Sequence, residues 1–181
     1  ISAEKMKSMA SWLDYNLEID EMHDEIKRIE NNIIKDIIES SDVILSTNSS
    51  AALDSISNTK FDVVIVDEAS QATIPSVLIP IAKARRFILA GDHKQLPPTI
   101  ISDRAQDLQD TLFESLIEKY PHKSQLLNVQ YRMNKTLMEF PNSEFYNNNL
   151  KSDLSVDNIT LKDISAVEDD DALLFIDTCK R

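Results

Sequence analysis

The stretch Phe-Asp-Val-Val-Ile-Val-Asp-Glu-Ala-Ser-Gln at residues 61–71 decides the fold class, because a run of apolar residues ends abruptly in two carboxylates. An unbroken apolar run at residues 63–66 is typical of a strand covered on both faces, as in a parallel sheet. Adjacent carboxylates, Asp67 and Glu68, are costly at the tip of such a strand unless something cationic lies there. Since open α/β sheets bind ligands at the carboxyl ends of their strands, the stretch predicts a ligand site at residues 67–71.

Other short apolar runs predict further strands, at residues 42–47, 86–90, 126–129 and 173–176. Between these runs, three segments are predicted to be helical: residues 76–83, 112–119 and 133–140. Pro75 is a favourable first-turn residue, and Asp110 or Thr111 is the expected N-cap of the second helix. This alternation of strands and helices predicts a three-layer α/β domain.

Residues 1–40 are predicted to be helical, and one face of that helix is apolar. The apolar stripe has a near-heptad spacing and consists of Ile19, Met22, Ile26, Ile29, Ile33 and Ile37. We expect this stripe to pack on the chain's own domain, and a partner-binding coiled coil is the alternative. The polar segment at residues 146–171 is predicted to be a loop or linker.

Composition excludes several classes of protein. The 181 residues hold a single glycine, Gly91, so neither a Gly-x-x-x-x-Gly-Lys-Ser/Thr nor a Gly-x-Gly-x-x-Gly loop exists within them. A net charge of −12 argues against strong binding to nucleic acid by this chain alone, because phosphate neutralisation drives such binding. The apolar runs are too short to span a bilayer, so no membrane partner is expected. A lone cysteine, Cys179, favours a reducing, intracellular setting.

Two further polar segments follow predicted strands. Leu-Ala-Gly-Asp-His-Lys-Gln-Leu-Pro-Pro-Thr at residues 89–99 places Gly91 at a turn and offers Gln95 for contact with a terminal phosphate or a water molecule. Asn-Val-Gln-Tyr-Arg-Met at residues 128–133 places Arg132 at an expected helix start. An arginine there suits a bidentate, charge-assisted contact with phosphate. Taken separately, each segment is weak evidence of function.

Taken together and in this order, residues 67–71, 91–98 and 130–133 resemble motifs II, III and IV of superfamily 1 helicases. The closest resemblance is to group B, the group of the nonsense-mediated-decay helicase, senataxin and the immunoglobulin-mu-binding helicase. Residues 43–50 are similar to motif Ic, which contacts nucleic acid, and residues 140–146 are similar to the segment after motif IV. The resemblance covers residues 41–150.

The resemblance implies a RecA-like P-loop NTPase sheet flanked by helices, in an AAA-type ATPase-like motor that couples hydrolysis of ATP with Mg²⁺ to movement on single-stranded RNA or DNA. It implies that Asp67 holds magnesium largely through water, that Glu68 polarises the attacking water, and that Gln95 senses the γ-phosphate. Arg132 is the implied arginine finger. The nucleotide site is further assigned Gln71, Gly91, Asp92 and Tyr131. The nucleic-acid contacts are assigned to Ser46, Thr47 and Asn48.

The departures from the family are large. The phosphate-binding loop with its strand, and the second RecA-like domain, are partners that this chain does not contain. We therefore expect an incomplete motor: an accessory stalk at residues 1–40, part of the first RecA-like domain at 41–150, and a linker with a strand at 151–181. Without the missing strand, the strands at 86–90 and 126–129 are expected to lie apart rather than to pair. The alternatives are another P-loop ATPase and a non-enzymatic interaction module that uses the stripe at residues 19–37.

Overall fold

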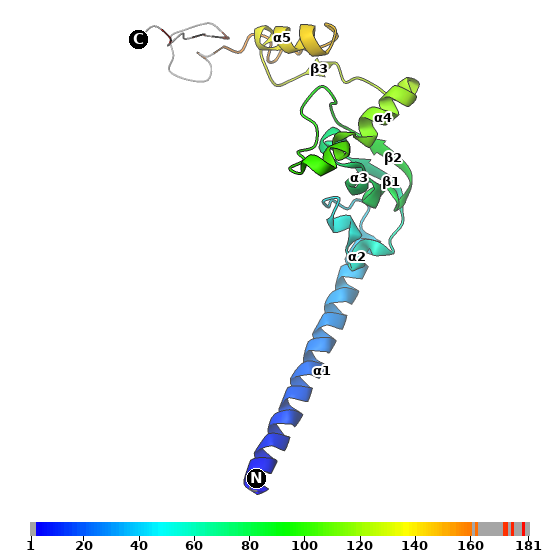
Figure 1. Cartoon of the computed structure of the whole chain (residues 1–181), viewed down its shortest axis with the longest axis vertical. Coiled ribbons are helices and arrows are strands. Elements are labelled where there is room, and N and C mark those ends of the chain that lie inside the picture. Colours follow the sequence, from blue (N-terminus) through cyan, green and yellow to red (C-terminus); the bar gives the residue numbers. More distant parts are fainter. Residues whose placement is uncertain (1–2, 161, 163–171, 174, 176–178, 180–181) are drawn as a thin grey trace. The chain divides into compact units, whose positions relative to one another are not determined.

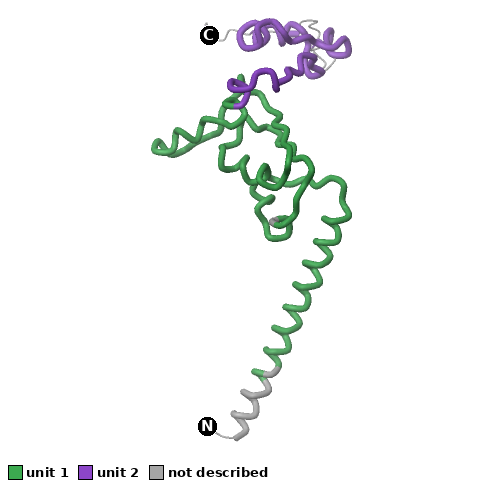
Figure 2. The backbone as a smooth tube through the Cα atoms, turned by 90° about the vertical axis from the view of Figure 1, so that its right-hand side faces the viewer, with its two compact units in different colours: residues 1–115 green, residues 116–181 purple. Residues whose placement is uncertain are grey.

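The computed structural model describes residues 3–160, 162, 172–173, 175 and 179. The chain divides into two compact units, residues 1–115 and residues 116–181, and each unit is described by itself (Figure 2). None of the described helices is both long and apolar enough to cross a membrane.

Helix α1 (Ala3–Ser40) is a single uninterrupted helix, so the helical prediction is confirmed over residues 3–40 (Figure 1). Its last turn is closed by the Ser41 hydroxyl, which donates to the Ile37 carbonyl at 2.6 Å. The six residues of the apolar stripe remain 36–59% exposed. The expected packing of the stripe is therefore wrong for the part of the chain that the structure describes, because no described segment covers that face.

Residues 42–47 do not form the predicted strand. The segment has no β-ladder partner among the described residues, and Val43 and Leu45 are 76% and 92% exposed. An apolar run becomes a strand only when a neighbouring backbone accepts its hydrogen bonds. Two short helical turns follow, η1 (Ser50–Ala52) and α2 (Asp54–Ser57).

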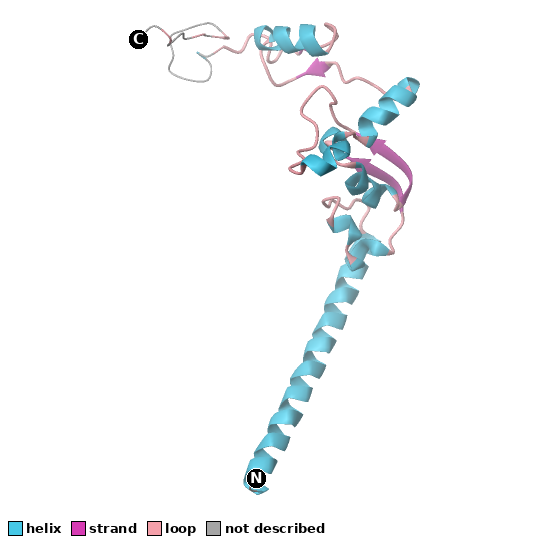
Figure 3. Ribbon diagram, in the orientation of Figure 1, coloured by secondary structure: helices cyan, strands magenta, loops and turns pink. Residues whose placement is uncertain are grey.

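Strands β1 (Phe61–Val66) and β2 (Ala84–Leu89) confirm the two strongest strand predictions. They pair in parallel, with Phe61 opposite Ala84 and Val66 opposite Leu89 (Figure 3). Helix α3 (Ile74–Ile81) connects them, preceded by the short turn η2 (Ala69–Gln71). Pro75 lies in the first turn of α3, as predicted, and the helix begins two residues earlier than the sequence indicated.

The two faces of this sheet differ in burial. Helix α3 packs against both strands, and Val66 and Val77 are 4% and 0% exposed. Alternation along the strands places Val63, Ile65 and Ile88 on the opposite face. These three side chains are exposed, Ile65 by 68%. The prediction of a sheet covered on both faces is therefore wrong for the described residues, which supply a helix to one face only.

Unit 1 continues through η3 (Asp103–Gln109) into α4 (Leu112–Lys119), whose bounds are those predicted from the sequence. The N-cap prediction is decided in favour of Thr111, because its hydroxyl accepts a hydrogen bond from the Glu114 N–H at 3.2 Å. The short turn η4 (Pro121–Lys123) follows.

Unit 2 contains a second small parallel sheet. Strand β3 (Val129–Gln130) pairs with β4 (Lys151–Ser152), and α5 (Lys135–Phe145) lies between them in sequence. Most of the strand predicted at 126–129 does not form, and β4 lies within a segment predicted to be a loop. Strands β2 and β3 belong to different sheets, so the direct pairing that would contradict an incomplete sheet does not occur. The strand predicted at 173–176 falls largely outside the described residues.

Candidate nucleotide site at the strand ends

Asp67 and Glu68 leave the carboxyl end of β1 through a strained turn. Glu68 has φ 52° and ψ 36°, in the left-handed region that is uncommon for a residue with a side chain. Such a conformation costs on the order of 1–3 kcal/mol, and it occurs most often at functional sites. The Asp67 carboxylate accepts a hydrogen bond from the Glu68 N–H at 3.0 Å. Both side chains are exposed, so the predicted acidic strand tip is present and open to solvent.

Gln71 orients the Glu68 side chain. Its Nε2 donates to Glu68 Oε2 at 3.1 Å, and its backbone N–H donates to the Glu68 carbonyl at 2.9 Å. Between these two residues, Ala69 and Ser70 are buried. The turn is thus anchored in the core at its centre while its two polar side chains remain at the surface.

The loop after β2 lies directly against this turn. The Ala69 N–H donates to the Ala90 carbonyl, and the Ala90 N–H donates to the Val66 carbonyl, both at 2.8 Å. The buried Ser70 hydroxyl then accepts from the Asp92 N–H at 2.9 Å. A Cβ on Gly91 would lie 2.9 Å from both the Ser70 nitrogen and its hydroxyl oxygen. The one glycine of the chain is therefore placed where two backbones approach too closely for any side chain.

Asp92 organises the rest of that loop. Its carboxylate accepts from the Lys94 N–H at 3.0 Å and from Gln95 Nε2 at 2.9 Å. Gln95 and Gln71 line a common open pocket of about 380 Å³ together with Lys94 and Leu96. Among the residues that the sequence assigned to the nucleotide site, Glu68, Gln71 and Gln95 thus form one group in unit 1.

The segment at residues 46–48 forms a polar turn in the same unit. Thr47 Oγ1 accepts from the Ser50 N–H at 3.1 Å and donates to the Ser50 hydroxyl at 2.8 Å. Asn48 Nδ2 donates to the Ser76 hydroxyl in the first turn of α3 at 3.2 Å. Ser46 and Thr47 are exposed.

Tyr131 and Arg132 belong to unit 2 and lie in the turn between β3 and α5. Both are exposed, Tyr131 by 67%. The residue that closes this turn is Gln130, whose Oε1 accepts from the Arg132 and Met133 N–H groups at 2.8 and 2.9 Å. Sequence reasoning quoted Gln130 within the motif and gave it no role. The position of Gln130 at the end of a strand, just before two turn residues, is the sequence signal that could have indicated its role.

Comparison with known families gives two matches along the chain. An AAA domain family matches residues 2–103, and a second AAA domain family matches residues 108–181. The chain belongs to the AAA-domain, superfamily 1 type helicases. The resemblance of the chain to superfamily 1 helicases is thereby confirmed. Membership of this helicase family also decides against a P-loop ATPase of the transporter or signalling type.

Relatives in the helicase family come from archaea and eukaryotes. An ATP-dependent helicase of Methanocaldococcus jannaschii, named as uncharacterized, is 50% identical over 171 residues, which are 94% of this chain and 26% of the relative. The DNA-binding protein SMUBP-2 of Mus musculus is 39% identical over 91% of this chain and 18% of its own length. The ATP-dependent helicase NAM7 of Saccharomyces cerevisiae is 42% identical over 70% of this chain and 13% of its own length. The chain therefore spans about a quarter or less of the curated relatives that it matches.

Proposed function

We propose that this chain is part of the first RecA-like domain of an ATP-driven helicase or translocase that moves on single-stranded RNA or DNA. The observation that carries the proposal is the Glu68 turn. A carboxylate is held in a left-handed backbone conformation at the end of a parallel strand, and Gln71 orients it by a hydrogen bond of 3.1 Å. This strained, exposed arrangement suits a group that positions water rather than one that stabilises the fold.

The neighbouring residues suit the remaining roles at a nucleotide. Asp67 offers one exposed carboxylate, and Mg²⁺ typically takes one or two protein carboxylates together with phosphate oxygens and water. In the described part of the chain, no group of three or more His, Cys, Asp or Glu side chains could hold a metal ion alone, which fits a metal bound mainly through nucleotide. Bound Mg²⁺ would neutralise charge on the phosphates. Gln95, held by Asp92 beside Gln71, would contact the terminal phosphate.

Arg132 would supply the positive charge that stabilises phosphate oxygens in the transition state, and exposed Tyr131 would contact the nucleotide. The exposed hydroxyls of Ser46 and Thr47, with the amide of Asn48, would contact the backbone of a nucleic acid strand. The names of the relatives, which include ATP-dependent helicases and a DNA-binding protein, support both assignments.

The complete motor also needs parts that these 181 residues do not hold. A single glycine excludes a Gly-x-x-x-x-Gly-Lys-Ser/Thr loop within them, so the phosphate-binding loop and its strand must come from another segment. We assign residues 1–40 to an accessory stalk, 41–150 to the first RecA-like domain and 151–181 to the connection toward a second RecA-like domain. The exposed face of the β1–β2 sheet, with Ile65 and Ile88, supports this reading because a buried sheet needs cover there.

The test is nucleic-acid-stimulated ATP hydrolysis by the complete motor protein, with wild type compared with Glu68→Gln. Loss of the water-positioning carboxylate is expected to lower stimulated turnover by a factor of about 100 or more, because glutamine keeps the shape but cannot accept the proton. Glu114→Gln is a matched control, since Glu114 is an exposed carboxylate on α4.

Each other outcome has a definite meaning. Equal turnover of wild type and Glu68→Gln would remove Glu68 from the catalytic role. No turnover in either protein would favour a non-enzymatic interaction module, for which the exposed apolar stripe of α1 is the supporting observation.

A further inference from the structure

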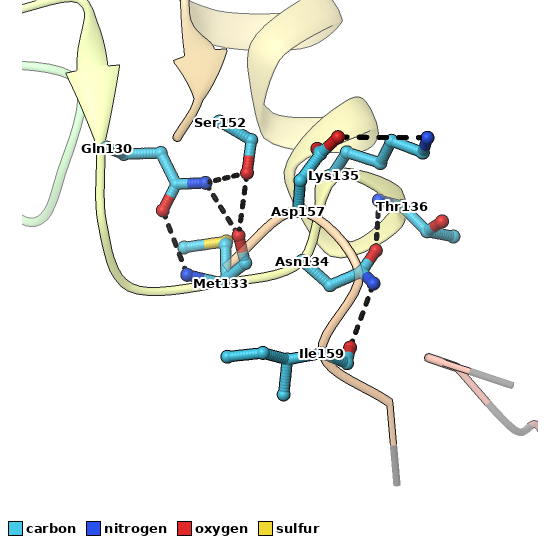
Figure 4. Close-up of polar contacts among 8 residues, drawn as sticks. All are labelled: Gln130, Met133, Asn134, Lys135, Thr136, Ser152, Asp157 and Ile159. Atoms are coloured by element: carbon cyan, nitrogen blue, oxygen red, sulfur yellow. Dashed lines mark hydrogen bonds and ion pairs between the residues drawn. The ribbon is translucent and has the colours of Figure 1, made fainter. Parts of the chain in front are cut away.

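The Gln130 side chain makes four hydrogen bonds, three to the turn at residues 131–133 and one to Ser152 of β4. Its Oε1 accepts from the Arg132 and Met133 N–H groups at 2.8 and 2.9 Å. Its Nε2 donates to the Met133 carbonyl at 2.7 Å and to the Ser152 hydroxyl at 2.9 Å (Figure 4). An amide is the side-chain group that can accept twice and donate twice in this way, so no other residue type reproduces all four contacts.

These contacts determine the backbone conformation of the turn that carries Arg132. The Arg132 N–H donates to Gln130 Oε1. The next residue, Met133, is held by Gln130 through both its N–H and its carbonyl (Figure 4). Gln130 holds the backbone of the turn, and the Tyr131 and Arg132 side chains remain exposed. The arginine side chain is thus exposed on a turn in which the Arg132 N–H and both peptide groups of Met133 are hydrogen-bonded to Gln130.

The turn between β3 and α5 is also anchored to the segment around β4. The Ser152 hydroxyl donates to the Met133 carbonyl at 3.1 Å, so it lies between Gln130 and the turn. Asn134, 7% exposed, donates from Nδ2 to the Ile159 carbonyl at 2.8 Å. Lys135 forms an ion pair of 3.9 Å with Asp157 (Figure 4). The first two of these contacts are hydrogen bonds of part-buried groups, which makes the base of the turn rigid relative to its exposed side chains.

We propose that Gln130 is a positioning residue for Arg132: it holds the turn so that the guanidinium is preset for the terminal phosphate. The inference rests on the proposed role of Arg132 in ATP hydrolysis. It adds that the role depends on an uncharged side chain that never touches the nucleotide. Misplacement of a catalytic group by about 1 Å lowers a rate by about 100-fold, so loss of this amide should reduce turnover strongly.

The test uses the complete motor protein and the variant Gln130→Met, which keeps the length and loses all four hydrogen bonds. The expected result is a fall in stimulated kcat of about 10- to 100-fold with little change in KM for ATP, because an arginine finger acts chiefly in the transition state. Gln125→Met is the matched control. Gln125 is exposed, and its amide contacts the adjacent Leu126 carbonyl at 3.0 Å. This control should keep wild-type kcat.

A double-mutant cycle with Arg132→Ala separates positioning from general damage. If Gln130 acts through Arg132, adding Gln130→Met to Arg132→Ala costs nothing further. If Gln130→Met merely weakens the fold, it lowers the residual activity of Arg132→Ala by the same factor as in wild type, and the proposal is overturned. Wild-type kcat in Gln130→Met alone would overturn it as well. An active Arg132→Ala protein would instead remove the proposed role of Arg132, and the Glu68→Gln comparison would still stand.

Discussion

Gly91 shows how a single residue controls the candidate site. The Ser70 hydroxyl and backbone lie so near that a methyl group on Gly91 would be 2.9 Å from both. We expect Gly91→Ala to destabilise the folded chain by about 1–3 kcal/mol, the usual cost of forcing an extra methyl into a tight contact. Thermal unfolding of the purified chain measures this change. The same variant should move the loop that carries Asp92 and Gln95.

A second variant identifies the cause of the loss of stability in Gly91→Ala. Ser70→Ala in the Gly91→Ala background removes the hydroxyl but leaves the Ser70 backbone nitrogen at 2.9 Å and the Ala69 nitrogen at 3.3 Å. Backbone atoms of a buried turn cannot withdraw, so only part of the stability should return. Full recovery would mean that the hydroxyl alone causes the clash, and an unchanged melting temperature in Gly91→Ala would contradict the close approach itself.

At the scale of elements, α5 depends on a residue just outside it. Asn134 Oδ1 accepts from the Thr136 N–H at 2.7 Å and caps the helix, while Nδ2 tethers the helix start to Ile159. Asn134→Ala loses both contacts and removes the hydrogen-bond partners of the Thr136 N–H and of the Ile159 carbonyl. We expect the local stability of α5 to fall by about 1–3 kcal/mol. Amide hydrogen exchange at Thr136 and along α5 measures this change.

Asn134→Asp separates the two effects of Asn134→Ala, the loss of the helix cap and the loss of the contact with Ile159. The carboxylate still accepts from Thr136 and caps the helix, but it cannot donate to the Ile159 carbonyl. The rate of amide hydrogen exchange in α5 should therefore lie between the rates in wild type and in Asn134→Ala. Identical exchange in all three proteins would show that neither contact stabilises the helix start.

For the whole molecule, we propose that the chemistry is divided between this chain and segments outside these 181 residues. The 181 residues carry acidic, amide and arginine groups suited to nucleotide but only one glycine, and hence no phosphate-binding loop. We expect the purified 181-residue chain to show no steady ATP hydrolysis, with or without single-stranded RNA or DNA. A coupled phosphate-release assay checks this, with the complete motor protein as the positive control. Steady turnover by the chain alone, abolished by Glu68→Gln, would contradict this division.

The fold was predictable where local pattern is enough. Apolar runs and polar ends marked β1 and β2, and helical spacing with a capping threonine marked α4 to the residue. The run at residues 42–47 looks the same in sequence and forms no strand, because a strand also needs a neighbour. Strand β4 has no apolar pattern at all, and it exists because residues 151–152 pair with β3.

The sequence by itself therefore determined the family, the order of the motif-like segments and the absence of a Gly-x-x-x-x-Gly-Lys-Ser/Thr loop within these 181 residues, since these depend on residue identity and spacing. Tertiary structure alone decided how those residues are held. It placed Glu68 in a left-handed turn, brought Gly91 close to Ser70 and gave Gln130 three hydrogen bonds in the Arg132 turn and a fourth to Ser152. The physical reason is that backbone strain, close approach and shared hydrogen bonds arise between segments, and a linear pattern does not encode such distances.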